Sequence, residues 1–179
     1  HYVSSNIQAI DNTPVLDFWQ PRLAQCEALD FSVDVDIKPQ QLVKVHYLPE
    51  ELWQSLETYC RKNRTTPALF LKMVYSLLIA NYCRAGDDFY ISEFHAGRDK
   101  DTAKTLGCFF LQSPFIFSHE LFAKETPISQ LLAYARDFRK MIKPYDAISM
   151  GLTKQLAPQG RLHFMFNYYH FFPQDQCLM

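Results

Sequence analysis

The sequence lacks the features that would place the chain in a membrane or on a nucleic acid. Its longest apolar stretch, ALFLKMVYSLLIANYC at 68–83, is shorter than the roughly 20 residues of a membrane span and is interrupted by Lys72. The formal net charge is -1, without the basic stripe that displaces counterions from nucleic acids. No basic segment followed by an apolar one begins the sequence, as a secretion signal would. We therefore expect a cytoplasmic protein that binds neither membrane nor nucleic acid.

Metal-binding and common catalytic motifs are also missing. The sequence has no CxxC pair, no His/Cys/Asp spacing typical of zinc, no P-loop and no nucleophile elbow. We therefore expect no metal site. The cysteines are few and widely spaced, which predicts reduced, mostly buried thiols. They are Cys26, Cys60, Cys83, Cys108 and Cys177.

The composition is that of a folded domain. Hydrophobic residues make up 48% of the 179 residues and aromatic residues 15%, so the chain can bury a wide apolar interior. There is no internal repeat, low-complexity tract or Pro/Gly-rich linker. We expect residues 1–179 to form a single unit.

Thr-Pro pairs predict several helix starts. At Thr13, Thr66 and Thr126, the hydroxyl can accept from an unpaired N–H while the following proline has no N–H to satisfy. Another start is Pro49, because the acidic residues after it suit the positive end of a helix. The predicted helices are 14–28, with Pro21 as a kink, 49–63, 67–84, 127–143 and 147–156. The helix at 67–84 is apolar nearly all round and is expected to be the most buried.

Four segments have the aromatic and β-branched content of strands. Together with the helices they predict a two-layer α/β fold, in which helices pack on one face of a mixed sheet. Pro114 cannot donate to a sheet ladder, so its strand is expected to be bulged or to lie at an edge. The predicted strands are QLVKVHYL at 41–48, DFYISEF at 88–94, FFLQSPFIF at 109–117 and RLHFMFNYYHF at 161–171.

Two stretches contain polar residues that could meet a ligand. In FFLQSPFIF, Gln112 and Ser113 stand among aromatic residues, where they could line a channel or bond to neighbouring backbone. In EFHAGRDK, His95 is next to a Gly-Arg turn. The guanidinium of Arg98 could fix this loop near a ligand or could lie on a solvated surface. Both interpretations stay open at each stretch.

Taken together, residues 17–168 resemble the C-terminal lobe of the condensation domains of nonribosomal peptide synthetases. DFWQPRLA at 17–24 is similar to the helix that opens this lobe, and residues 48–92 are similar to its long helical pair and central strand. AGRDK matches the Ala-Gly-Arg-Asn turn of the family through Gly97 and Arg98.

LGCFFLQSPFIF is similar to the glycine-aromatic strand motif of the same family. It keeps Gly107, Phe109 and Phe110, while Gln112 and Ser113 stand for the Asn and Thr of the motif.

Two further segments match the family less well. PYDAISMGLTKQLAP at 144–158 retains Asp146 but has Ile-Ser-Met in place of Pro-Phe-Glu. HYVSSNI at 1–7 looks like the HHxxxDG motif that carries the proposed catalytic base. The gap between this segment and Phe18 is too short for that motif, so it corresponds better to the tyrosine-rich stretch just before the lobe. We expect the N-terminal lobe and the extreme C-terminal elements of the domain to be absent from this chain.

The resemblance implies one lobe of the chloramphenicol-acetyltransferase-like fold. In this fold two lobes form a V, and the phosphopantetheine arms of carrier proteins enter the cleft from opposite sides. The family joins carrier-bound aminoacyl or peptidyl thioesters by amide bond formation. This lobe would form the acceptor-side tunnel wall, supply no catalytic residue and be inactive alone. The tunnel candidates are Glu93, His95, Arg98, Gln112 and Ser113. The structural motif residues are Gly97, Gly107, Phe109, Phe110 and Asp146.

The implied partners are the N-terminal lobe of the same condensation domain, carrier proteins and an adjacent adenylation domain. No cofactor would bind directly, apart from the phosphopantetheine arm of the carrier proteins. Two other functions stay open: a non-catalytic condensation-like interaction module, and a relative that catalyses epimerisation or cyclisation. An isolated lobe is also expected to expose apolar surface and to self-associate.

Overall fold

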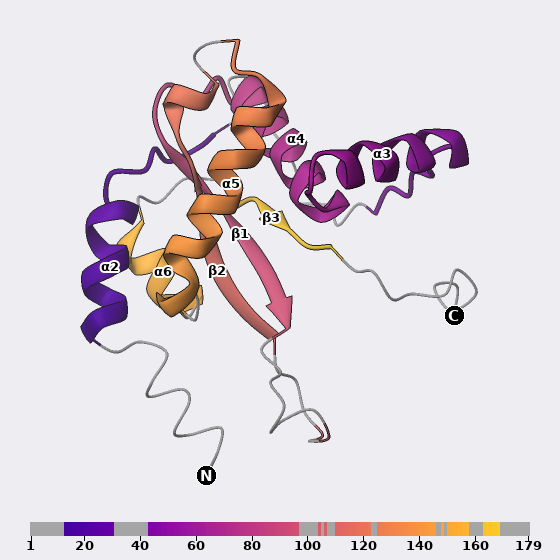
Figure 1. Cartoon of the computed structure of the whole chain (residues 1–179). Helices are drawn as coiled ribbons and strands as arrows, with labels where there is room; N and C mark the ends of the chain where they lie inside the picture. Colours follow the sequence, from indigo (N-terminus) through magenta and orange to yellow (C-terminus); the bar gives the residue numbers. More distant parts are fainter. Residues whose placement is uncertain are drawn as a thin grey trace.

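A computed structural model of the chain shows a mixed α/β fold (Figure 1). It describes residues 13–30, 43–96, 104, 106, 110–122, 125–145, 148, 150–157 and 163–168. Strands β1 (Phe89–Ala96), β2 (Phe110–Phe117) and β3 (Met165–Phe166) form a sheet in the order β2-β1-β3. β1 runs antiparallel to β2 and parallel to β3, so the predicted mixed sheet and fold class are confirmed.

The helices lie within a few residues of their predicted positions, and the first ends two residues after Pro21. Short 3-10 turns, η1 and η2, follow β2 and α5. The helical elements are α2 (Thr13–Leu23), α3 (Glu50–Lys62), α4 (Pro67–Tyr82), η1 (His119–Leu121), α5 (Ile128–Ile142), η2 (Lys143–Tyr145) and α6 (Met150–Leu156).

The Thr-Pro rule holds best at α4. Thr66 is the N-cap, and its Oγ1 accepts from the N–H of Leu69 at 3.2 Å. At α5 the predicted cap is wrong. Pro127 is the N-cap residue, because its ψ of 141° is not helical, and the helix therefore begins at Ile128. Thr126 is then one residue too early to cap it.

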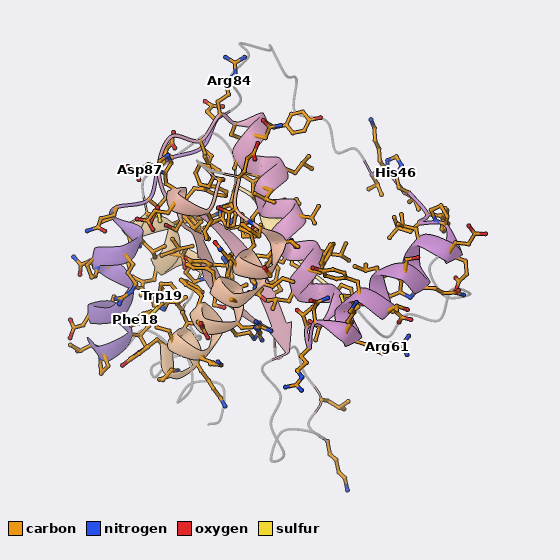
Figure 2. All side chains as sticks on the ribbon, turned by 45° about the horizontal axis from the view of Figure 1, so that its top comes forward. Phe18, Trp19, His46, Arg61, Arg84 and Asp87 are labelled. Atoms are coloured by element: carbon orange, nitrogen blue, oxygen red, sulfur yellow. The ribbon has the colours of Figure 1, made fainter. Side chains whose placement is uncertain are left out.

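The predicted strand at 41–48 is wrong over its described part. Residues 43–49 form no strand, and Val43, Val45 and Tyr47 are exposed. Figure 2 shows His46 of this segment next to α3, away from the sheet. The alternating pattern is typical of a half-buried strand, but a strand also needs a partner, and none of the described strands pairs with this segment.

Helices α4 and α5 pack on one face of the sheet, and α5 crosses in front of it in Figure 1. On this face Phe89 and Ile91 of β1 pair with Phe117 and Phe115 of β2. The ring of Phe138, from α5, packs edge-on against Phe115 at 5.0 Å between centroids. The core is therefore an aromatic layer between sheet and helices.

Helix α2 is attached to this core through Trp19, which is fully buried (Figure 2). The indole Nε1 donates to the carbonyl of Tyr145 at 2.7 Å, and the neighbouring Phe18 ring stacks on Tyr145 at 4.3 Å. These contacts join α2 to the turn η2, far away in the sequence.

The edge position of β2 agrees with the expectation from Pro114. This residue pairs in regular register with Ser92, and β2 is one of the two outer strands of the described sheet. The prediction that α4 is the most buried helix is confirmed, because α4 has the smallest share of exposed residues among the described helices; it still exposes Val74, Leu78 and Tyr82. These side chains recur every four residues and so form one stripe, which the described elements leave uncovered.

Candidate functional site

Glu93 lies at the centre of a three-residue ion cluster that joins the sheet to two helices. Its Oε2 is 2.8 Å from Nζ of Lys72 on α4, and its Oε1 is 2.8 Å from Nη1 of Arg139 on α5. One carboxylate therefore bridges two cations. Because each oxygen has its own partner, the Glu93 side chain is held in one orientation.

Lys72 is the buried member of this cluster, with 1% of its side chain exposed. Its Nζ lies 4.1 Å from the centroid of the Phe115 ring, a cation–π contact. Burial lowers the pKa of Lys72 from its ordinary value of 10.5, and the charge and hydrogen bond of Glu93 oppose this shift. A lone lysine in an apolar helix was the sequence signal for this pair, because buried charges need partners.

The cluster opens into a groove of about 790 Å³ between the helices and the ends of β1 and β3. Among the described residues that line it, five side chains are cationic and only Glu93 is acidic. The apolar part of the lining comes from both helices and from the sheet. The groove residues are Thr66, Ala68, Leu69, Lys72, Glu93, Phe94, Ser113, Arg136, Arg139, Lys140, Ile142, Lys143, Phe166 and Tyr168.

Another polar group connects β1, β2 and the segment that leads into β3. Nε2 of Gln112 donates to Oγ of Ser92 at 2.7 Å, and this oxygen is 3.0 Å from Nε2 of His163. Burial, and then the charge of Lys154, lower the pKa of His163. A neutral His163 can accept from the Ser92 hydroxyl, while Oε1 of Gln112 is buried without a partner among the described residues.

The structure brings together only part of the predicted site. Glu93 and Ser113 pair across β1 and β2, and both line the groove. Gln112, the residue before Ser113 on β2, points to the opposite face and bonds to Ser92, so it does not share the groove with Ser113. Lys72 and Arg139 were absent from the sequence-based set, because their approach to Glu93 depends on tertiary packing.

The other predicted positions are described in part or not at all. The backbones of His95 and Phe110 belong to β1 and β2, where they pair with Leu111 and Ala96. Their side chains lie outside the described part of the structure. So do the remaining predicted residues, which are Gly97, Arg98, Gly107, Phe109 and Asp146.

The described residues contain neither a candidate metal site nor a candidate membrane-spanning helix. No group of three or more His, Cys, Asp or Glu side chains could hold a metal ion there. No described helix is long and apolar enough to cross a membrane.

Comparison with solved structures identifies the fold. No family model and no curated protein matches the sequence. Among solved structures, the condensation domain from the Monacolin K polyketide synthase MokA is similar over 86% of this chain, with a TM-score of 0.67 and 16% identity. The chain has a condensation-domain-like fold.

Two further solved structures share this condensation-domain-like fold. The X-domain from teicoplanin biosynthesis matches 89% of the chain with a TM-score of 0.63 and 16% identity. The X-domain in its complex with OxyB matches 82% with a TM-score of 0.58 and 15% identity. This chain covers 37%, 37% and 33% of the three solved chains, respectively, or about a third of their length.

Proposed function

We propose that the chain is part of a condensation domain of a nonribosomal peptide synthetase and forms the acceptor-side wall of its tunnel. The observation that carries this proposal is the fold shared with the MokA condensation domain over 86% of the chain. The order of the motifs in residues 17–168 supports it. The parent protein would act in the cytoplasm, next to carrier proteins and an adenylation domain, and would join two carrier-bound thioesters through an amide bond.

The residues of the groove would position the substrate rather than transfer protons. Glu93 is fixed by Lys72 and Arg139, so it can hold a ligand donor at the floor of the groove without rotating away. The cationic rim suits the phosphate of a phosphopantetheine arm, and Phe166 and Tyr168 offer it apolar contact. The base would come from the N-terminal lobe, so this chain alone would be inactive.

The test starts from the intact source protein. Peptide sequencing upstream of His1 is expected to find a lobe with an intact HHxxxDG motif. The protein that contains both lobes should then join carrier-bound aminoacyl thioesters, as followed by intact-protein mass spectrometry. Glu93→Gln should slow this reaction, while the matched change Glu120→Gln, at an exposed residue of η1, should not. A preceding lobe without the second His of the motif would refute amide formation.

A non-catalytic interaction module is the second candidate. It is favoured by the similarity to two X-domain structures, one of them solved in complex with OxyB. The loss of Pro-Phe-Glu near Asp146 supports the same candidate. Such a module would bind a modifying enzyme of its own pathway and leave carrier-bound amines unchanged. Size-exclusion chromatography of the parent domain with that enzyme, beside the condensation assay, separates the two candidates.

A further inference from the structure

We infer that His163 is a positioning residue for the groove: through Ser92 it holds the segment of residues 163–168 on the sheet, and it releases this segment when it is protonated. The inference rests on the proposed function in treating the groove as the substrate site. It adds a residue that lies outside the groove and bonds to the face of the sheet opposite Glu93.

The segment 163–168 supplies one wall of the groove. Phe166 and Tyr168 line the groove beside the two helices. The strand within this segment, β3, is two residues long and pairs with β1 over that length. So short a strand forms few ladder bonds, and its position therefore depends on the other contacts of the segment.

Ser92 of β1 is the residue to which the segment is tied. Its backbone N–H donates to the carbonyl of Phe164 at 2.9 Å, and its Oγ lies 3.0 Å from Nε2 of His163. Ser92 is fully buried, whereas the His163 side chain is exposed and in contact with water. The segment also packs on α4 through the rings of Phe166 and Tyr75, 5.8 Å apart between centroids. Of these contacts, the bond to His163 is the one that changes with protonation between pH 5 and 8.

The hydrogen bonds around Ser92 require a neutral imidazole. Nε2 of Gln112 donates to Oγ of Ser92 at 2.7 Å, so the serine proton is directed at Nε2 of His163. That nitrogen accepts only while it carries no proton, because an imidazolium is a donor at both nitrogens. Protonation therefore replaces the acceptor of the serine proton with a second donor and removes the bond that ties His163 to the sheet.

The surroundings of His163 oppose its protonation. The described groups that face its ring are Ser92 and Tyr90 of β1, with the Tyr90 ring edge-on at 6.0 Å, and Lys154 of α6. None of these described groups is a carboxylate that would stabilise an imidazolium. Burial, and then the charge of Lys154, lower the pKa of His163 from its ordinary value of 6.5. The released segment regains the ordinary value, so acid below pH 6.5 favours release.

Hydrogen–deuterium exchange of the full 179-residue chain, measured by mass spectrometry over residues 164–168, tests the inference. The reference is His163→Gln, whose amide oxygen still accepts from Ser92 but does not titrate. The ratio of the two exchange rates, native over His163→Gln, cancels the intrinsic effect of pH on exchange. This ratio should be close to unity at about pH 7.5 and should rise below pH 6.5 by up to about tenfold for each pH unit.

Two further variants complete the exchange experiment. His163→Leu has no acceptor and should exchange faster than the native chain over residues 164–168 at about pH 7.5, with the fold checked by circular dichroism. The matched control is His119→Gln, which changes a half-buried histidine outside the groove and should leave exchange over 164–168 unchanged. A ratio of native to His163→Gln that stays constant with pH, or a control that speeds exchange as His163→Leu does, overturns the inference.

The exchange experiment needs no substrate, so its outcome is separate from that of the proposed function. A pH-dependent exchange ratio in a protein that forms no amide supports the inference and refutes the proposed function. In a protein with both lobes that does form amides, the ratio of KM, native over His163→Gln, should rise below pH 6.5 while the ratio of kcat stays constant. A constant KM ratio beside a pH-dependent exchange ratio would overturn the positioning role of His163.

Discussion

Lys72 on α4 and Glu93 on β1 form an ion pair at 2.8 Å in which the lysine is almost completely buried. Arg139 approaches the other oxygen of Glu93 from α5, with its own side chain 53% exposed. The two cations therefore differ in environment. Lys72 depends on Glu93 for its charge to be tolerated, whereas Arg139 has water as an alternative partner.

This difference predicts unequal effects of breaking the pair. Glu93→Gln leaves Lys72 buried without its counter-charge and should lower the free energy of unfolding by about 2–4 kcal/mol. Lys72→Met replaces the buried charge with an apolar chain of similar length and should be neutral or stabilising. Urea unfolding followed by circular dichroism measures both. If both variants lose the same free energy of unfolding, Lys72 stabilises the fold and is not merely tolerated in it.

The lowered pKa of Lys72 predicts a pH dependence. Between its folded pKa and the ordinary value of 10.5, the unfolded chain binds more protons than the folded chain, so stability rises with pH there. Lys72→Met lacks this titration. The stability of the native protein relative to Lys72→Met should therefore increase as the pH approaches 10.5. A gap that stays constant across this range would mean that the pKa of Lys72 is not lowered.

The hydrogen-bonded group around Ser92 predicts a difference between two conservative changes. Ser92→Ala removes the acceptor of Gln112 Nε2 and should lower the free energy of unfolding by about 1–3 kcal/mol. Gln112→Met removes that donor together with the buried Oε1, which has no partner among the described residues, and should be less damaging. Thermal unfolding of the two variants gives the order, and the reverse order would contradict the hydrogen bonds described.

Three cysteines should be unreactive in the folded protein. Cys26, Cys60 and Cys83 are buried free thiols, as the sequence predicts for its cysteines. Burial, followed by the charges of Asp88 and Asp87, raises the pKa of Cys26 to about 12. Since only the thiolate reacts, alkylation at about pH 8 should leave these three unlabelled until urea is added. Peptide mapping by mass spectrometry identifies the labelled sites, and rapid labelling of Cys26 without urea would contradict this expectation.

Exposed apolar side chains predict self-association. Val43, Val45 and Tyr47 are exposed on the segment before α3, and Leu78 and Tyr82 are exposed on α4. Sedimentation velocity over a range of concentrations should detect association. The variant Val43→Thr/Val45→Thr/Tyr47→Ser should reduce it, while Lys44→Gln should not. If the protein stays monomeric at high concentration and does not bind an apolar dye, the expected self-association is wrong.

The sequence alone determined most of the helices and the strands β1 and β2, because these follow from local rules. The predicted strand at 161–171 is too long, since β3 covers only Met165–Phe166 and the described residues 163, 164, 167 and 168 are not in a strand. Thr66 and Pro67 specify the start of α4 through capping chemistry, and the residues of β1 and β2 have the side chains that suit a sheet. The mixed sheet followed from the order of these elements, whereas the condensation-like fold was implied by the resemblance of the motifs in residues 17–168. The local rules failed at residues 43–48, where a strand needs a partner from elsewhere in the chain.

Only the tertiary structure decided which side chains form the candidate site. Glu93 and Ser113 could be selected as polar residues of strands, but period alone does not reveal that Lys72 and Arg139 converge on Glu93 from two helices. Lys72 lies 21 residues before Glu93, and Arg139 lies 46 residues after it. Packing of α4 and α5 on one face of the sheet brings Lys72 and Arg139 to Glu93. The buried Lys72 is tolerated there because the Glu93 carboxylate compensates its charge.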